Sequence, residues 1–456
     1  MRNWLPLQHS YRSYKRLQRT GLFNSSPPMV LAAGFMMLIA LGTLLLMLPI
    51  STHRPISLFT AFFTATSAVT VSGMALIDLG STLTYFGQIV ILVLIQIGGL
   101  GFVTFAVVAA LSMGKKISLK QQALVLEAFN QTSVSKVRET AFAVLKIAVA
   151  IELIGLVILT LWWWRDTSFL KALYSALFHT VSAFNNAGIS LHADSLTRYV
   201  DDPVTILTIT LLIILGGIGF SVLTDVRAKR SWSKLRPYTK IILLGTLTLN
   251  LLGFLLIWAL EFNNPRTLGA LSTQGQALAA WLHSVASRTA GFSSIDVGAL
   301  TDSSTLIIIL FMFIGGGSLS TASGIKLGTF IVLLAAAYSY IFQRSEVVLL
   351  KRSISPETVQ KSLALLLVTL FLAFIATVLI SIFDQIPFIN ILFEVVAALS
   401  TTGLGRNVTP YLSTPSHCIL ILLMFAGRLG PLTLVYSLAS QSRSRIRYPE
   451  TEIPVG

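Results

Sequence analysis

The stretch TSAVTVSGM, residues 66–74, is a short polar run that leads to a glycine, and three later segments repeat it. They are VSAFNNAGI (181–189), VASRTAGFS (285–293) and AALSTTGLG (397–405). Their glycines recur at intervals of 115, 103 and 112 residues: Gly73, Gly188, Gly291 and Gly403. A pore needs such repeated turns when four backbone loops must meet on one axis. The pattern predicts a cation-conducting membrane protein with internal four-fold pseudo-symmetry.

The composition points to the lipid bilayer as the surrounding medium. Of 456 residues, 54% are apolar and only 11% are charged, whereas a soluble protein carries about 25% charged residues. Apolar stretches of roughly 20 residues, enough to span a bilayer, occur in pairs. We predict outer helices at 29–48, 140–164, 240–260 and 361–383, and inner helices at 84–112, 204–224, 304–341 and 416–439.

A half-apolar segment lies between the two members of each pair, such as SLFTAFFTATSA (57–68) or ALAAWLHSVASR (277–288). About ten helical residues reach only about 15 Å, half the hydrocarbon thickness. Irregular backbone at that depth is tolerated only where protein buries it or where it lines water. The predicted fold is therefore an all-α integral membrane protein of four membrane–pore–membrane units, with eight transmembrane helices and four half-membrane pore helices around one pore.

This reading divides the chain into six parts. They are a basic N-terminal leader (1–28), pore repeat 1 (29–113), pore repeat 2 (114–226), pore repeat 3 with a broken inner helix (227–342), pore repeat 4 (343–441) and a C-terminal tail (442–456).

The net charge of +15 is distributed unevenly. Of the 33 basic residues, 23 lie in the termini or in every second loop. By the positive-inside rule, both termini and those loops are expected to be cytoplasmic. Topology thus accounts for the basic charge, and nucleic acid is not an expected partner. The first apolar run, near Met29, is long enough to stay as a signal anchor.

Each loop glycine has a physical reason to be glycine. If the carbonyl oxygens of successive residues are to point one way, some residue must adopt backbone angles that a Cβ makes costly. One such glycine alone is explained by a simple turn, but four in matching contexts favour a selectivity filter that binds cations at its backbone carbonyls. The predicted filter residues are Thr70, Val71, Ser72 and Gly73; Asn185, Asn186, Ala187 and Gly188; Arg288, Thr289, Ala290 and Gly291; and Ser400, Thr401, Thr402 and Gly403.

The inner helices share a second motif, which reads QIGGLGF (96–102), ILGGIGF (214–220), FIGGGSLSTASGIK (313–326) and FAGRLGPLT (425–433). Small residues let helices approach closely or bend, so packing explains the first two. The third is predicted to break alone among the inner helices and to leave a polar loop that acts as a gate. Its residues are Gly315, Gly316, Gly317, Ser318, Leu319, Ser320, Thr321, Ala322, Ser323 and Gly324.

Ionisable residues inside the spans are functional candidates by default. Arg428 is predicted to face the pore, and Lys326 is a second candidate, although a long basic side chain can instead snorkel or pair with a carboxylate. Glu152 reads as a packing group, and Glu394 lies in a predicted helix. At the outer mouth, Asp78, Asp194 and Asp296 follow three of the glycines; they either concentrate cations or are ordinary loop charges.

The four glycine-ended loops, the segment GGGSLSTASGIK and the motif AGRLGPLT together resemble the Trk/Ktr/HKT superfamily of potassium transporters, most closely its Ktr-type membrane subunits of bacterial Na⁺-dependent K⁺ uptake. The resemblance covers essentially all residues after about Pro27. It implies a homodimer with one pore per subunit and a cytosolic ring of RCK-type nucleotide-binding regulatory subunits. It also implies that the loop at 315–324 is the gate and that Arg428 lies beneath the filter.

In that family, serine at the first filter glycine accompanies sodium preference and glycine accompanies potassium preference, so Gly73 fits potassium. Leu319, Ala322 and Ser323 depart from the family's more glycine-rich loop, which predicts a stiffer or more hydrophobic gate.

Three other functions are open to this sequence. A sodium or unselective cation pathway of the same fold is disfavoured by Gly73. A secondary transporter would have two inverted halves, whereas here all four repeats begin on the same side. A membrane enzyme would need a convergent catalytic cluster, and the six histidines show no ligand spacing; His179 and His283 occupy matching places that suggest structural use.

Overall fold

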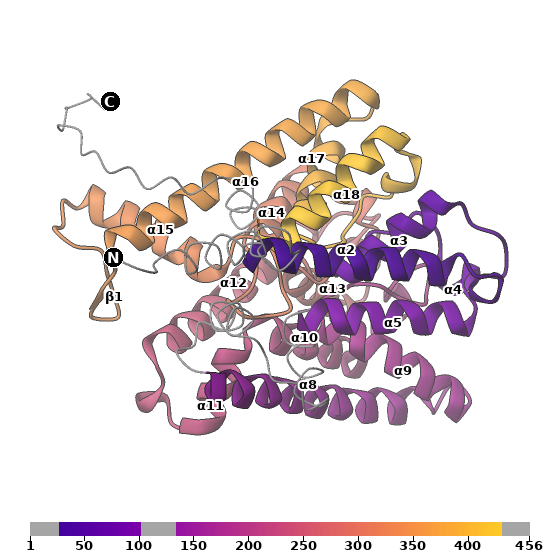
Figure 1. The fold of residues 1–456 in the computed structure, drawn as a ribbon, viewed down its shortest axis with the longest axis horizontal. Helices are drawn as coiled ribbons and strands as arrows, with labels where there is room; N and C mark the ends of the chain where they lie inside the picture. Colours follow the sequence, from indigo (N-terminus) through magenta and orange to yellow (C-terminus); the bar gives the residue numbers. More distant parts are fainter. Residues whose placement is uncertain (1–26, 102–133, 431–456) are drawn as a thin grey trace, which may run out of the picture.

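The computed structural model describes residues 27–101 and 134–430, and these are mostly helical. The predicted outer helices correspond to α2 (Pro27–Leu46), α8 (Val134–Trp163), α12 (Pro237–Glu261) and α16 (Pro356–Phe383). Figure 1 shows the axes of α2, α5 and α8 lying nearly parallel, as the axes of helices that share a bilayer do. Continuous apolar runs specify these helices, so their positions are readable from the sequence.

Each outer helix packs against a shorter helix that follows it. The shorter helices are α3 (Leu58–Thr70), α9 (Phe169–Phe184), α13 (Thr273–Ala286) and α17 (Phe388–Leu399). They contain 12 to 16 residues rather than about ten. Side-chain caps start two of them, because Ser57 accepts from the N–H of Thr60 and Ser272 from the N–H of Gly275.

The inner helices begin at the predicted places and end early. They are α5 (Tyr85–Leu100), α10 (Pro203–Gly217), α14 (Asp302–Phe313) and α18 (Thr414–Leu429). Gly101 and Gly430, with φ of 83° and 88°, end α5 and α18. The predicted continuations at 102–112 and 431–439 lie outside the described residues.

The expectation that only the third inner helix breaks is wrong. After α10, Gly219 adopts a φ of 102° and α11 (Phe220–Lys229) leaves at an angle of 96°. The predicted repeat boundary after residue 226 therefore falls inside a helix. What distinguishes the third repeat is the length of the break, because residues 314–326 separate α14 from α15 (Leu327–Ile341).

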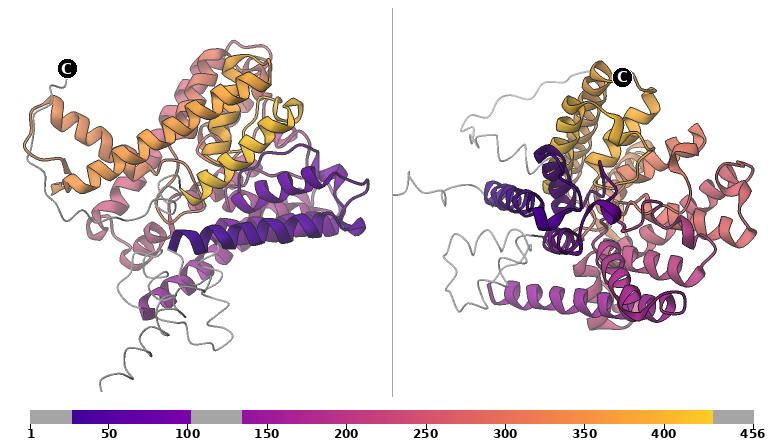
Figure 2. Two further views of the ribbon diagram at one scale, coloured as in Figure 1. Left: turned by 45° about the horizontal axis from the view of Figure 1, so that its top comes forward. Right: turned by 90° about the vertical axis from the view of Figure 1, so that its right-hand side faces the viewer.

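The remaining described elements are short. A hairpin of β1 (Val348–Leu349) and β2 (Arg352–Ser353) precedes α16. The helix α4 (Leu79–Thr82) and several 3₁₀ turns lie in connections between the longer helices. The left view of Figure 2 shows α15 and α16 extending beyond the body formed by the other helices.

Polarity is distributed as a bilayer requires. The outer helix α16 exposes Leu367, Phe371 and Phe374 by 57% to 67%, whereas the short helix α3 buries Thr66 and Thr70 completely. Among the described residues, three helices are long and apolar enough to cross a membrane, and the bent pair α10–α11 adds a fourth. Other predicted spans, including α5, α14 and α18, are apolar helices of only 10 to 17 residues in the structure. The count of eight spans therefore stays a prediction.

Glycines set the contact between short and inner helices. A Cβ on Gly98, Gly216 or Gly427 would overlap the carbonyl oxygen of Val69, Phe184 or Leu399, respectively. Each of those oxygens lies at or next to the C-terminal end of the preceding short helix. The motifs at 96–102, 214–220 and 425–433 thus share one packing role. Their glycines let an inner helix pack directly against the last turn of the preceding short helix.

We predict that Gly216→Ala lowers the melting temperature of the purified protein, because the added methyl must displace backbone. Gly328→Ala is the matched control: it also lies inside a helix, but its nearest neighbour would be Tyr238 at 3.7 Å. Alanine is favoured over glycine in helices by up to about 1 kcal/mol, so the control is expected to keep or raise the melting temperature. Equal effects of the two substitutions would contradict the packing role.

Candidate ion pathway

The four glycine-ended loops share one unusual backbone. One to three residues after each short helix, a residue adopts left-handed φ: Val71 (58°), Asn186 (59°), Thr289 (79°) and Thr401 (50°). Two residues later the glycine is left-handed as well, at 79°, 64°, 70° and 79° for Gly73, Gly188, Gly291 and Gly403. The residue between them has negative φ, since it is absent from the positive-φ positions of the described chain. Left-handed β-branched residues are strained outliers, so this conformation is imposed by the surroundings.

The glycines also meet one another in a closed ring. A Cβ on Gly73 would overlap the carbonyl oxygen of Ala187, and one on Gly188 that of Ala290. The series continues from Gly291 to Thr402 and from Gly403 back to Ser72. Each glycine thus abuts the carbonyl that precedes the glycine of the next loop. We call these four glycines the glycine ring.

One open cavity of about 350 Å³ lies above the glycine ring and is lined by all four glycines. Its wall comes from the segments that follow them, including Asp78, His192 and Asn407. The four loops, which are far apart in the chain, therefore open into a single mouth.

The first residue of each loop is an anchor. The hydroxyl of Thr70 donates to Thr66 O at 2.7 Å, and that of Ser400 donates to Val396 O at 2.6 Å. Both hydroxyls also contact a second hydroxyl in their own loop, at 2.8 Å. These two side chains thus hold the loop against the last turn of its own helix.

Asn185 and Arg288 anchor their loops to other helices. The Nδ2 of Asn185 donates to Gln96 Oε1 at 2.6 Å, and Gln96 Nε2 donates to Glu152 at 3.2 Å. The Arg288 guanidinium is buried and donates at 3.1 Å to Asn250 Oδ1 and to Gly315 O. Gln96 and Asn250 were missed in the sequence, where a lone amide in an apolar helix gives no sign of its partner.

The polar segment 315–324 is a compact loop whose two ends touch. The Gly315 N–H donates to Ile325 O at 2.8 Å, and a Cβ on Gly324 would lie 3.3 Å from Gly315 Cα. The loop docks on the break between α10 and α11: Gly317 N–H donates to Gly217 O and Phe220 N–H donates to Leu319 O, both at 2.8 Å. The glycines of ILGGIGF therefore make room for a neighbouring backbone as well as for a pore helix.

Arg428 joins three inner-helix motifs. It donates to Thr321 O at 2.5 Å and to Ser323 Oγ at 3.3 Å in the polar loop. It also donates to Gly98 O, and to Gly99 O at 2.8 Å, at the end of α5. Its partners are thus oxygens of the protein, and the described residues offer it no carboxylate. Lys326 donates to Ala322 O at 2.5 Å, which closes the same loop from its other end.

The remaining buried ionisable groups support loops. Glu394 accepts from the N–H of Arg406 at 2.9 Å and from Thr409 at 2.6 Å, which holds the segment after the fourth glycine. Glu152 links α8 to α5 through Gln96. His179 is buried between Ser175 O at 2.8 Å and Ser190 Oγ at 3.0 Å, and its ring stacks on His192.

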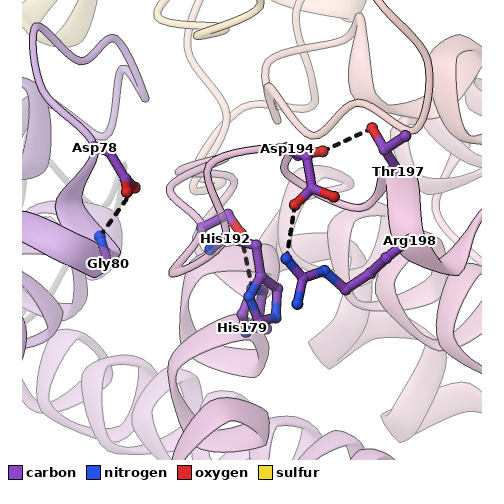
Figure 3. Close-up of polar contacts among 8 residues, drawn as sticks. Asp78, Gly80, His179, His192, Asp194, Thr197 and Arg198 are labelled. Carbon is purple, nitrogen blue, oxygen red and sulfur yellow. Dashed lines mark hydrogen bonds and ion pairs between the residues drawn. The ribbon is translucent and has the colours of Figure 1, made fainter.

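The three acidic residues at the mouth also have local roles, two of which are visible in Figure 3. Asp78 caps α4 by accepting from Gly80 N–H at 3.2 Å, and Asp194 pairs with Arg198 at 3.0 Å. Asp296 accepts from Gly298 N–H at 2.9 Å and from Asn407 Nδ2 at 2.8 Å. All three carboxylates are exposed, so these bonds leave them open to cations as well. Burial, and then the charge of Arg198, lowers the pKa of the nearby His192.

Residues 27–101 and 134–430 contain no group of three or more His, Cys, Asp or Glu side chains that could hold a metal ion.

Comparison with known proteins identifies the family. The family model TrkH, described as a cation transport protein, matches residues 23–445. The "Ktr system potassium uptake protein B" of Bacillus subtilis is 46% identical and that of Vibrio alginolyticus 40% identical, each over 94% of this chain and 97% or 95% of the relative. The "Potassium/sodium uptake protein NtpJ" of Enterococcus hirae is 34% identical over 94% of this chain and 97% of the relative.

The crystal structure of the potassium transporter TrkH from Vibrio parahaemolyticus shares the fold. It superposes with a TM-score of 0.74 at 20% identity, covering 92% of this chain and 86% of that one. This likeness confirms the predicted all-α membrane fold, while the number of repeats stays a prediction. The family is one of transporters rather than enzymes, as expected. The chain is therefore an integral membrane protein that belongs to the TrkH family of cation transport proteins.

Proposed function

We propose that this protein takes up K⁺ across the bacterial plasma membrane through a selectivity filter formed by its four glycine-ended loops. The observation that carries the proposal is the glycine ring, in which four strained loops from distant parts of the chain meet around one mouth. Alternating handedness along each loop turns successive carbonyl oxygens to the same side, and rings of carbonyls replace the hydration shell of K⁺. The relatives named for potassium uptake support the choice of ion.

The filter residues are those predicted from the sequence, with a division of labour that their contacts support. The glycine of each loop belongs to the glycine ring, and the carbonyl oxygen of the third residue contacts the glycine of a neighbouring loop. The first residues, Thr70, Asn185, Arg288 and Ser400, act behind it as anchors. The carboxylates of Asp78, Asp194 and Asp296 raise the local concentration of cations at the mouth.

The polar loop 315–324 is the proposed gate. Its docking on the α10–α11 break uses backbone hydrogen bonds that can be remade, unlike a packed apolar core. Arg428 latches the loop to α5, and its charge beneath the filter disfavours a resident cation there. Opening therefore requires that the bonds from Arg428 to Thr321 and Ser323 be given up together.

Dependence on Na⁺, a homodimer with one pore per subunit, cytoplasmic termini and a cytosolic ring of RCK-type nucleotide-binding subunits complete the proposal. Their support is the similarity to the Ktr-system proteins. The name of the Enterococcus hirae relative, which includes sodium, favours one alternative: a Na⁺ or unselective cation transporter of the same fold.

The deciding experiment expresses the chain in a bacterial strain that lacks potassium uptake. Rescue of growth at low K⁺ and influx of rubidium, measured with and without Na⁺, are the expected results. Sodium influx that equals rubidium influx would favour the alternative. Failure to rescue when the regulatory subunit is also expressed would refute the proposed function.

We predict that Gly73→Ser lowers the ratio of K⁺ to Na⁺ flux by about tenfold, or ~1.4 kcal/mol. The serine must hold a φ of 79° and push against Ala187 O, so it distorts the ring. Gly101→Ser is the control, because Gly101 has a similar φ of 83° and no atom of residues 27–101 or 134–430 lies within 4 Å of its Cβ position. Unchanged selectivity in Gly73→Ser, in protein that is folded, would contradict the filter assignment.

We also predict that deleting residues 316–323 raises K⁺ flux. Because Gly315 and Gly324 already touch, the deletion joins neighbouring residues without moving α14 or α15. A deletion of eight residues, 346–353, in the β1–β2 hairpin is the control for chain shortening. Rubidium influx into vesicles, normalised to folded protein, is the measurement. Flux that is equal or lower in the 316–323 deletion would argue against a gate.

A further inference from the structure

The corner between α10 and α12 carries a concentrated positive charge that the pathway does not use. It comprises α11, the turn η4 (Trp232–Lys234) and the start of α12. Residues 220–240 contain six basic residues and one acidic residue, Asp225. Asp225 pairs with Lys229 at 3.4 Å and with Arg236 at 3.6 Å, and every ion pair of this corner within the described chain involves it. Arg227, Arg230 and Lys234 are exposed and have no carboxylate partner in that part of the structure. We call these three residues the corner cations.

The corner lies along the membrane surface. Because α11 leaves α10 at 96°, it runs roughly in the bilayer plane when α10 crosses the bilayer. Trp232 exposes 51% of its surface beside the corner cations, and the Lys240 amine lies 6.0 Å from its ring centre. Tryptophan and basic residues together are typical of protein that rests at the headgroup level. The positive-inside rule explains the basic residues of the corner by membrane topology alone. It explains neither the angle of α11 nor the exposure of the Trp232 indole.

The corner is also bonded to the polar loop at two points. At its beginning, Phe220 N–H donates to Leu319 O at 2.8 Å. At its end, the hydroxyl of Tyr238 accepts from Ser318 N–H at 2.9 Å. Asp225 fastens the two ends together, because it accepts from Arg236 N–H at 2.9 Å and from Thr239 at 2.7 Å. These bonds tie the corner to the polar loop, so a ligand that restrains the corner also restrains the loop in its docked position.

We propose that the corner cations bind anionic phospholipid headgroups of the cytoplasmic leaflet and that the bound lipid favours the docked loop. Clusters of basic residues at the cytoplasmic end of a span attract anionic lipid, and the level of Trp232 suits a lipid better than a soluble partner. Anionic lipid thereby lowers ion flux through this protein. The lipid-binding part stands independently, whereas the effect on flux rests on the proposed function.

Lipid binding is tested first, by fluorescence. The full-length protein is reconstituted into phosphatidylcholine vesicles that contain phosphatidylglycerol, with bromine on the acyl chains of one lipid or the other at equal mole fraction. Quenching that disappears in Trp232→Phe reports lipid beside this residue. Greater quenching by brominated phosphatidylglycerol than by brominated phosphatidylcholine is expected. One surface cation changes lipid binding by roughly fivefold, so Arg227→Gln/Arg230→Gln/Lys234→Gln loses most of the excess.

The matched control is Arg344→Gln/Lys351→Gln/Arg352→Gln, which removes the same charge from exposed residues around the β1–β2 hairpin. This control is expected to keep the excess quenching. Equal quenching by the two brominated lipids, or equal loss in the two triple variants, would overturn the proposal. The first result would leave a soluble protein as the occupant of the corner.

Coupling to the loop is tested by rubidium flux in the same vesicles. The ratio of flux without phosphatidylglycerol to flux with it is expected to be larger for the wild type and for the hairpin variant than for the corner variant. The same ratio in all three proteins would refute the coupling. Absence of flux in every lipid mixture would count against the proposed function and leave the quenching result intact.

Discussion

The constraint on which the other features depend is the left-handed backbone at eight positions, two in each of the four glycine-ended loops. Four of these residues are glycines, but Val71, Thr289 and Thr401 are β-branched, and such a residue costs about 1–3 kcal/mol at positive φ. The loops keep this conformation because both sides hold them. On one side, each glycine contacts a neighbouring loop of the ring. On the other side, the anchor, which is the first residue of each loop, bonds the loop to a helix.

The glycine ring is nearly symmetric, whereas the contacts of the polar loop 315–324 and Arg428 are not. Gly98, Gly216 and Gly427 make the same contact with their pore helices. The polar loop, however, belongs to the third repeat, docks on the second, and is bonded through Arg428 to the first and fourth. Hydrogen bonds thus connect this one loop, directly or through Arg428, to all the other inner-helix motifs. The shared backbone suits a common task at every loop, and the unique contacts suit a device that changes state.

Much of the fold is readable from the sequence because its determinants are local. Outer helices are continuous apolar runs, and the strained loops are recognisable because their glycines recur in matching contexts. The break at Gly219 was not predicted, because ILGGIGF looks like a packing motif until the loop that docks on it is known.

Contacts at the site were less predictable than the elements that carry them. The partners of Arg428 include main-chain oxygens 329 and 330 residues away, and carbonyls leave no trace in a sequence. The anchor roles of Asn185 and Arg288 depend on Gln96 and Asn250, single amides in apolar helices. The sequence marks Asn185 and Arg288 as unusual residues for such loops, but it does not indicate which helices their side chains contact.

The closure of the glycine ring has a consequence for biosynthesis. Gly403 abuts Ser72, and Arg428 reaches Gly98, so the first and last repeats share a seam. As the chain emerges from the ribosome, the strained loop at Val71 lacks that neighbour until the fourth repeat has entered the bilayer. Left-handed valine has no reason to persist without it. The glycine ring is thus completed late in membrane insertion, and a nascent chain that stalls before residues 397–405 leaves the ring incomplete.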